Sequence, residues 1–122
     1  MTVQDAIDNA KMVCDDQFDD SVKWVWLHNL DLQIKHSIID THSGPIDIPE
    51  EYSSDSKLIM TAPYCEAYEW YIQAQSCLAN SEIDEYNAAM SMCQSRIMEF
   101  RNYWNRLNAP KSTAQGENKI II

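Results

Sequence analysis

Apolar residues recur every three or four positions through the last third of the chain. Eight of them follow one another at intervals of 3, 4, 3, 4, 3, 4 and 3: Ile83, Tyr86, Met90, Cys93, Ile97, Phe100, Trp104 and Leu107. This unbroken repeat predicts one long helix with a single buried face. Ser81 and Asp84 have the spacing of a capping box at its start, and Pro110 follows its end.

Three further helices are predicted upstream. Thr2 and Asp5 form another capping box, which opens a short helix over about 3–14. A helix over about 21–41 carries an apolar stripe at helical spacing: Trp24, Leu27, Leu30, Ile34 and Ile38. Pro63 opens the next helix, which runs to about Ala79. Its stripe consists of Tyr64, Tyr68, Tyr71, Gln75 and Leu78.

Four apolar residues of the segment 21–41 lie off its main stripe: Val25, Trp26, Leu32 and Ile39. A helix with apolar residues on more than one side is covered on more than one side. We therefore expect these residues to lie at a bundle centre or to pack against another subunit.

Residues 42–62 interrupt the helical pattern. Gly44 and Pro45 predict a turn, and the segments 46–48 and 57–60 are at most short strands. A loop of this length in a compact helical domain is usually functional or mobile. Its acidic residues are Asp47, Glu50, Glu51 and Asp55.

The predicted fold class is all-α: a small helical bundle of one short and three long helices, with a long irregular loop and an extended C-terminal tail. We expect one helical domain over 1–110, with the loop inserted at 42–62, and a tail over 111–122. The short connection at Asn80 and Ser81 makes the last two helices antiparallel neighbours.

Composition narrows the possible functions. Gly44 and Gly116 are the only glycines among 122 residues, which excludes a P-loop or a GxGxxG turn. No apolar run approaches the roughly 20 residues of a membrane span, and the N-terminus lacks a secretory pattern. We therefore expect no membrane association. The sequence pI near 4.5 argues against binding DNA through a basic face.

The cysteines and histidines show no metal-binding pattern. No zinc spacing connects Cys14, Cys65, Cys77 and Cys93, and no helical metal pair connects His28, His36 and His42. We expect no metal or cofactor, and we expect the cysteines to be small buried hydrophobes in a reducing compartment. A catalytic Cys–His pair is the alternative, but no local motif supports it, so the chain is not predicted to be an enzyme.

Charge is divided unevenly along the chain. Residues 1–95 contain 17 acidic and 4 basic residues, whereas residues 96–122 contain 2 acidic and 5 basic residues. An acidic body with a basic end is suited to head-to-tail docking on acidic surfaces. After Lys119 the chain finishes Ile120, Ile121, Ile122. Such a triplet is suited either to strand addition onto another chain or to packing on its own domain.

Several stretches resemble small proteins from tailed-phage head-morphogenesis clusters. They are residues 62–71 (APYCEAYEWY), residues 79–87 (ANSEIDEYN), and Phe100-x-x-Tyr103-Trp104-Asn105-Arg106 with Pro110. The N-terminal pattern fits too, through Trp26-Leu27-x-x-Leu30-Asp31 and Ile38-Ile39-Asp40-Thr41-His42. The likeness covers roughly residues 3–111. The chain thus resembles the head–tail connector proteins, also called adaptor or head-completion proteins.

This resemblance implies a structural virion protein of the neck, assembled in the host cytoplasm, with no catalytic residues. About twelve copies would form a ring between the portal and a downstream tail or stopper protein. The ring would extend the DNA channel, and DNA would pass through it without specific binding. We expect Asp47, Glu50, Glu51 and Asp55 to face the channel or the downstream ring, because acidic walls repel the DNA backbone. Lys119 and Ile120–Ile122 are expected to contact the portal.

Two other functions use the same features. A small acidic inhibitor that mimics DNA charge would bind a basic nucleic-acid enzyme through the acidic body. An enzyme with a Cys–His pair is the third alternative.

Overall fold

The computed structural model describes residues 1–13, 18–39 and 47–107. Within these ranges the chain forms four helices: α1 (Val3–Val13), α2 (Asp20–Ser37), α3 (Glu66–Ala79) and α4 (Ile83–Leu107). The described residues contain no strand, and their β-type pairing is a single antiparallel bridge between Thr2 and Lys57. The predicted all-α fold is therefore confirmed, whereas the short strand expected over 57–60 does not form.

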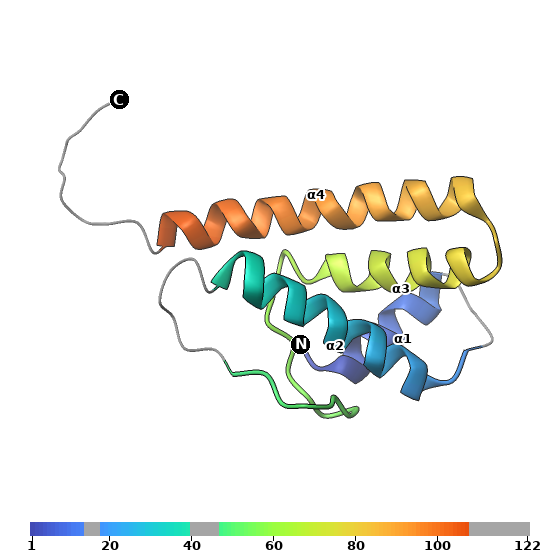
Figure 1. Ribbon diagram of the computed structural model, residues 1–122, viewed down its shortest axis with the longest axis horizontal. Helices are drawn as coiled ribbons and strands as arrows, with labels where there is room; N and C mark the ends of the chain where they lie inside the picture. Colours follow the sequence, from blue (N-terminus) through green and yellow to red (C-terminus); the bar gives the residue numbers. More distant parts are fainter. Residues whose placement is uncertain (14–17, 40–46, 108–122) are drawn as a thin grey trace, which may run out of the picture.

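The helices pack in two groups around α3. Figure 1 shows α3 and α4 as an antiparallel hairpin, with α1 and α2 on the side of α3 away from α4. The core lies where these groups meet, and its fully buried large side chains include Ile7, Leu27, Ile34, Tyr68 and Ile72. The loop from Asp47 to Met60 runs beside α2, and its residues Tyr52, Leu58 and Met60 belong to the same core.

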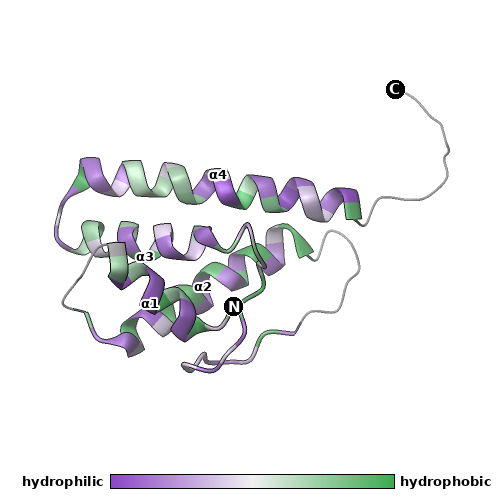
Figure 2. Cartoon of the chain, turned by 180° about the vertical axis from the view of Figure 1, so that it is seen from behind, coloured by the Kyte–Doolittle hydropathy of each residue, from purple (hydrophilic) through white to green (hydrophobic). Residues whose placement is uncertain are grey.

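The long helix α4 follows the predicted repeat. Cys93 and Phe100 are buried in the middle of the seam, while Ile83 and Leu107 at its two ends are exposed. Polar residues recur along α4 between the apolar ones, as Figure 2 shows by hydropathy. Phe100 belongs to an aromatic cluster with Tyr64 and Trp104, at ring-centroid distances of 5.8 and 6.0 Å. One face of α4 is therefore buried over its central turns, as its sequence predicts.

Two predicted helix boundaries need correction. α2 ends at Ser37, where the N–H of Ile38 bonds to the carbonyl of Ile34, rather than near residue 41. α3 begins at Glu66 rather than at Pro63. The Ala62–Pro63 peptide bond is cis, and the N–H groups of Tyr64 and Cys65 both donate to the Thr61 carbonyl. A turn thus occupies the place of the predicted first helical turn.

One of the two predicted capping boxes forms. The Asp5 N–H donates to Thr2 Oγ1 at 3.2 Å, and the Thr2 N–H donates to Asp5 Oδ2 at 3.0 Å. Ser81 does not take the extended backbone that an N-cap needs, because its φ is 61°. The N–H of Glu82 instead donates to the carbonyl of Cys77, which closes the end of α3. The prediction of a capping box at Ser81 is therefore wrong.

The buried side of α3 also differs from the predicted stripe. Its buried residues are Ala67, Tyr68, Ile72, Ala74 and Ser76, whereas Leu78 is 43% exposed. α3 packs against α4 on one side and against α1 and α2 on the other. Its buried positions therefore do not follow a single helical stripe.

Candidate functional site

A buried carboxylate joins the loop to two helices. Asp31 lies in α2 with no exposed surface. The Tyr52 hydroxyl, from the loop, donates to Asp31 Oδ2 at 2.6 Å, and the Tyr68 hydroxyl, from α3, donates to Oδ1 at 2.6 Å. The N–H of Ile59 donates to Oδ2 at 3.2 Å. Asp31 therefore joins two points of the loop, Tyr52 and Ile59, to α3.

Tyr68 extends this hydrogen-bond network to Met60, at the end of the loop. Its hydroxyl accepts the N–H of Met60 at 2.8 Å while it donates to Asp31. Burial raises the pKa of Asp31, against the opposing hydrogen bonds from Tyr52, Tyr68 and Ile59. Burial and the Asp31 carboxylate raise the pKa of both tyrosines, so their hydroxyls stay protonated and act as donors.

The N-terminus holds the same loop from another side. The N–H of Leu58 donates to the Met1 carbonyl at 3.1 Å, and the N–H of Val3 donates to the Ser56 carbonyl at 2.9 Å. Tyr52, Leu58 and Met60 are buried at these points of attachment. A loop with so many buried attachments is a fixed surface element, which is unusual for a long irregular segment.

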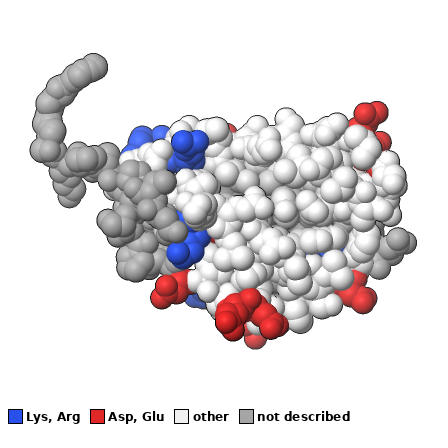
Figure 3. All heavy atoms as spheres, viewed as in Figure 1, with Lys and Arg blue, Asp and Glu red and all other residues white. Residues whose placement is uncertain are grey.

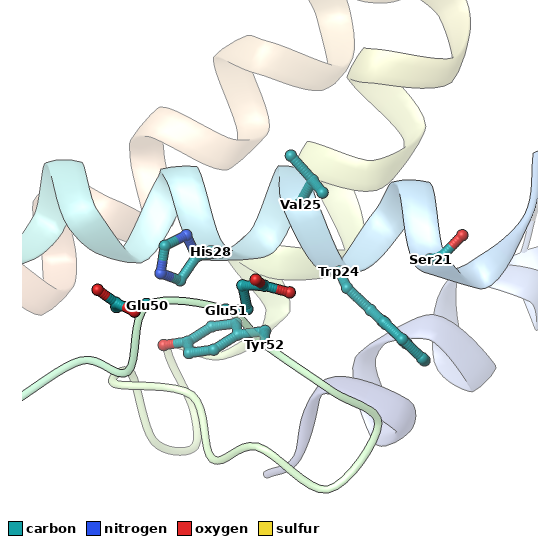
Figure 4. A pocket seen from close by; sticks show the side chains of 7 residues that line it. All are labelled: Ser21, Trp24, Val25, His28, Glu50, Glu51 and Tyr52. Atoms are coloured by element: carbon teal, nitrogen blue, oxygen red, sulfur yellow. The ribbon is translucent and has the colours of Figure 1, made fainter.

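A cleft of about 430 Å³ lies between α2 and this loop. Its lining residues are Ser21, Trp24, Val25 and His28 from α2 and Glu50, Glu51 and Tyr52 from the loop. Figure 4 shows Glu50 and Glu51 on either side of His28, with the Tyr52 ring below the imidazole. The cleft thus combines an apolar and aromatic wall with two carboxylates.

His28 fixes the geometry of the cleft. Its Nε2 lies 2.7 Å from the Pro49 carbonyl oxygen, and because that oxygen can only accept, Nε2 carries the proton. Its ring meets the Tyr52 ring edge to face, at a centroid distance of 5.0 Å. Since Tyr52 is itself bound to Asp31, the buried network positions the wall of the cleft.

Glu50 and Glu51 are exposed on the rim of the cleft. Among residues 1–13, 18–39 and 47–107, neither carboxylate has a hydrogen bond or an ion pair. Asp47 and Asp55 are also exposed but do not line the cleft. Of the four acidic loop residues singled out from the sequence, Glu50 and Glu51 therefore line the cleft, whereas Asp47 and Asp55 lie elsewhere on the loop.

The four α2 residues predicted to pack at a bundle centre or against another subunit differ in their exposure. Val25 and Leu32 are 57% and 42% exposed, and Val22 on the same helix is 38% exposed. Trp26 is half-buried and packs on the core, with its ring 5.5 Å from that of Phe18. Ile39 is fully buried in the chain's own core, so it is not available for a subunit contact. The exposed apolar face of α2 consists of Val22, Val25 and Leu32.

The end of α4 has the opposite charge. Arg101 and Arg106 are exposed, and neither makes an ion pair within the described part of the chain. Leu107 beside them is 62% exposed. Figure 3 shows basic residues at this end of the molecule and acidic residues at the other end and along the lower edge. On the face shown in Figure 3, basic residues therefore gather at the end of the molecule where α4 finishes.

Two cysteines in the described ranges, Cys65 and Cys93, do not have the surroundings of an activated nucleophile. Cys93 is fully buried, and burial raises its pKa to about 12. Burial also raises the pKa of Cys65. A catalytic thiol needs its pKa lowered, so these environments oppose that role. Cys14 lies outside the described residues.

The described residues contain no group of three or more His, Cys, Asp or Glu side chains placed to hold a metal ion. None of their helices combines the length and the apolar character that crossing a bilayer requires. The predicted portal contacts, Lys119 and Ile120–Ile122, lie outside the described residues. So does His42, whereas His36 is exposed on α2.

Comparison with known proteins adds no assignment: no family model, curated protein or solved structure matches the chain.

The sequence pattern did not point to Asp31 as the residue that organises the loop. One signal was present, because Asp31 stands four residues after Leu27 and three before Ile34, on the buried face of α2. A carboxylate on an apolar face needs partners. Its partners are Tyr52 and Tyr68, which are 21 and 37 residues away, and periodicity does not identify contacts at such separations.

Proposed function

We propose that this chain is a head–tail connector subunit of a tailed phage. Copies of it form a ring between the portal and the downstream tail or stopper protein, and the ring extends the DNA channel. The resemblance over residues 3–111 suggests this function, and the all-α bundle is compatible with it. Its place of action is the neck of the virion.

The single observation that carries the proposal is the anchored acidic loop. Asp31, Tyr68 and the N-terminal residues fix its inner side, while Asp47, Glu50, Glu51 and Asp55 are exposed on its outer side. A fixed row of carboxylates repels a DNA backbone and presents the same surface in every copy of a ring. Such a loop fits a channel wall or a contact with the next ring.

The exposed apolar face of α2 supports the same proposal. A ring subunit needs lateral surfaces for its two neighbours. Val22, Val25 and Leu32 offer such a surface, because they are exposed apolar side chains on one face of α2.

A connector is favoured over an inhibitor that mimics DNA. A mimic needs carboxylates spread over its binding face like phosphates, and on the one face that Figure 3 shows the acidic groups lie at the edges of a broad uncharged area. The separate basic end also fits assembly into a ring better than binding to a basic enzyme.

Incubation with the portal protein of the same genome tests this function. We expect rings on the portal in electron micrographs, and we expect deletion of residues 116–122 to abolish attachment. If that deletion leaves attachment intact, the tail does not bind the portal. If the full chain forms no ring with the portal but binds a basic nuclease in a salt-sensitive manner, the connector function is wrong and the inhibitor function is right.

A further inference from the structure

The cleft between α2 and the loop and the basic end of α4 are complementary surfaces of the same chain. The cleft has two carboxylates, Glu50 and Glu51, that pair with none of the described residues and lie next to an apolar wall. Near the end of α4, Arg101 and Arg106 have no ion pair with the described residues and line different hollows of the surface, and Leu107 beside Arg106 is exposed. Each surface offers the charge that the other lacks, and each has an apolar side chain beside it.

These two surfaces do not meet within one copy. Arg101 lines a hollow with Ser37 and Ile38, at the C-terminal end of α2. The cleft is lined by Ser21 to His28, in the N-terminal half of the same helix. His28 and Ser37 are separated by roughly 13 Å along the helix axis. Within the part of the chain that the structure describes, the carboxylates of the cleft therefore have no cationic partner.

We propose that the cleft of one copy receives the C-terminal end of α4 from a second copy. Glu50 and Glu51 pair with Arg101 and Arg106 of that copy, and Leu107 packs against the apolar wall formed by Val25 and Trp24. This inference rests on the proposed function and identifies the lateral contact of its ring. It assigns Glu50 and Glu51 to the contact between copies and leaves Asp47 and Asp55 for the channel or the downstream ring.

The geometry of this contact also accounts for a ring. The cleft and the α4 end are different surfaces, so each contact leaves one cleft and one α4 end free. Repetition of such a head-to-tail contact closes into a ring or continues as a filament. A cleft-to-cleft dimer is disfavoured, because it brings four unpaired carboxylates together.

A charge-swap experiment on the full chain tests the contact. Two double variants are made, Glu50→Lys with Glu51→Lys and Arg101→Glu with Arg106→Glu. Alone, each variant has two surfaces of the same sign, and we expect self-association about tenfold weaker than in the wild type. Mixed in equal amounts, every cleft faces an α4 end of opposite sign, and we expect recovery to within about threefold of the wild type.

A matched control carries the same change of charge elsewhere. Asp84→Lys with Glu85→Lys also reverses two adjacent exposed acids, at the start of α4 and outside the cleft. We expect its self-association to stay within about twofold of the wild type. Sedimentation velocity from micromolar to millimolar protein gives the association constants, and circular dichroism checks that each variant is folded.

Three outcomes overturn the inference: a wild type that stays monomeric over this range, a mixture that fails to recover, or a control as weak as the cleft variant. Electron micrographs with the portal separate this failure from failure of the function. Rings that form on the portal with both charge variants refute the contact and keep the connector. If the mixed charge variants recover self-association but no ring forms on the portal, the contact between copies is supported and the connector function is wrong.

Discussion

The α3–α4 hairpin and the region of α2 with its loop are held together by different forces. In the hairpin, apolar residues at regular spacing bury Cys93 and Phe100 along one face. In the loop region, one buried carboxylate collects two tyrosine hydroxyls and a backbone N–H from distant parts of the chain. Regular apolar packing joins the two straight helices of the hairpin, whereas the Asp31 hydrogen bonds hold an irregular loop in one conformation. The proposed function depends on the second arrangement.

Removal of Phe100 has the largest expected effect, on the hairpin. Its ring is buried on α4 and contacts the ring of Tyr64, just before α3, and that of Trp104. Phe100→Ala leaves a cavity, so we expect the free energy of unfolding to fall by about 3–5 kcal/mol. Urea unfolding followed by circular dichroism measures this change. A loss below about 1 kcal/mol would show that the aromatic cluster does not hold the hairpin.

Removal of Asp31 should detach the loop with a somewhat smaller effect. Asp31→Ala leaves the buried hydroxyls of Tyr52 and Tyr68 without their acceptor, so we expect a loss of about 2–4 kcal/mol. Hydrogen exchange should speed up at Ile59, whose N–H loses its acceptor, and much less at Cys93 in α4. Equal acceleration of hydrogen exchange at Ile59 and Cys93 would mean that Asp31 stabilises the hairpin as much as the loop.

The two regions also differ in how far the sequence predicts them. The intervals along α4 depend on neighbouring residues, so the periodicity located the helix, its buried face and its end. The loop depends on contacts over 21 and 37 residues, and its composition indicated only an irregular acidic segment. The acids were recognised as exposed. Their division between the cleft and the rest of the loop required the position of α2, which places His28 and Val25 beside Glu50 and Glu51.

The pH dependence of stability provides a test of the buried network itself. Burial raises the pKa of Asp31 above its ordinary value of 3.8, so the folded state favours the protonated carboxyl. Its contribution to stability is therefore fully present below the unfolded pKa and decreases as the pH rises through the folded pKa.

Asp31→Asn removes this titration. The wild-type free energy of unfolding minus that of the variant should therefore decrease from acidic toward neutral pH, as measured by urea unfolding in a series of buffers. A constant difference would mean that the hydrogen bonds balance the effect of burial on Asp31, and an increase with pH would mean that they outweigh it.

The exposed apolar face of α2 should contribute least to the stability of one copy. Val25→Ser with Leu32→Ser changes side chains that are 57% and 42% exposed, so we expect less than about 1 kcal/mol of change in unfolding. We expect the same variant to weaken ring formation clearly, because the face is proposed to contact a neighbour. Normal ring formation by this variant would exclude Val25 and Leu32 from the subunit contact.

An image of the phage neck tests the central claim most directly. Electron cryomicroscopy of intact virions should show a ring of this chain directly below the portal. In that ring Asp47 and Asp55 should face the channel or the downstream protein, and the cleft at Glu50 and Glu51 should hold the α4 end of a neighbouring copy. A virion neck that lacks this chain would contradict the connector function. A ring with the loop on its outer rim would contradict the role assigned to the acidic loop.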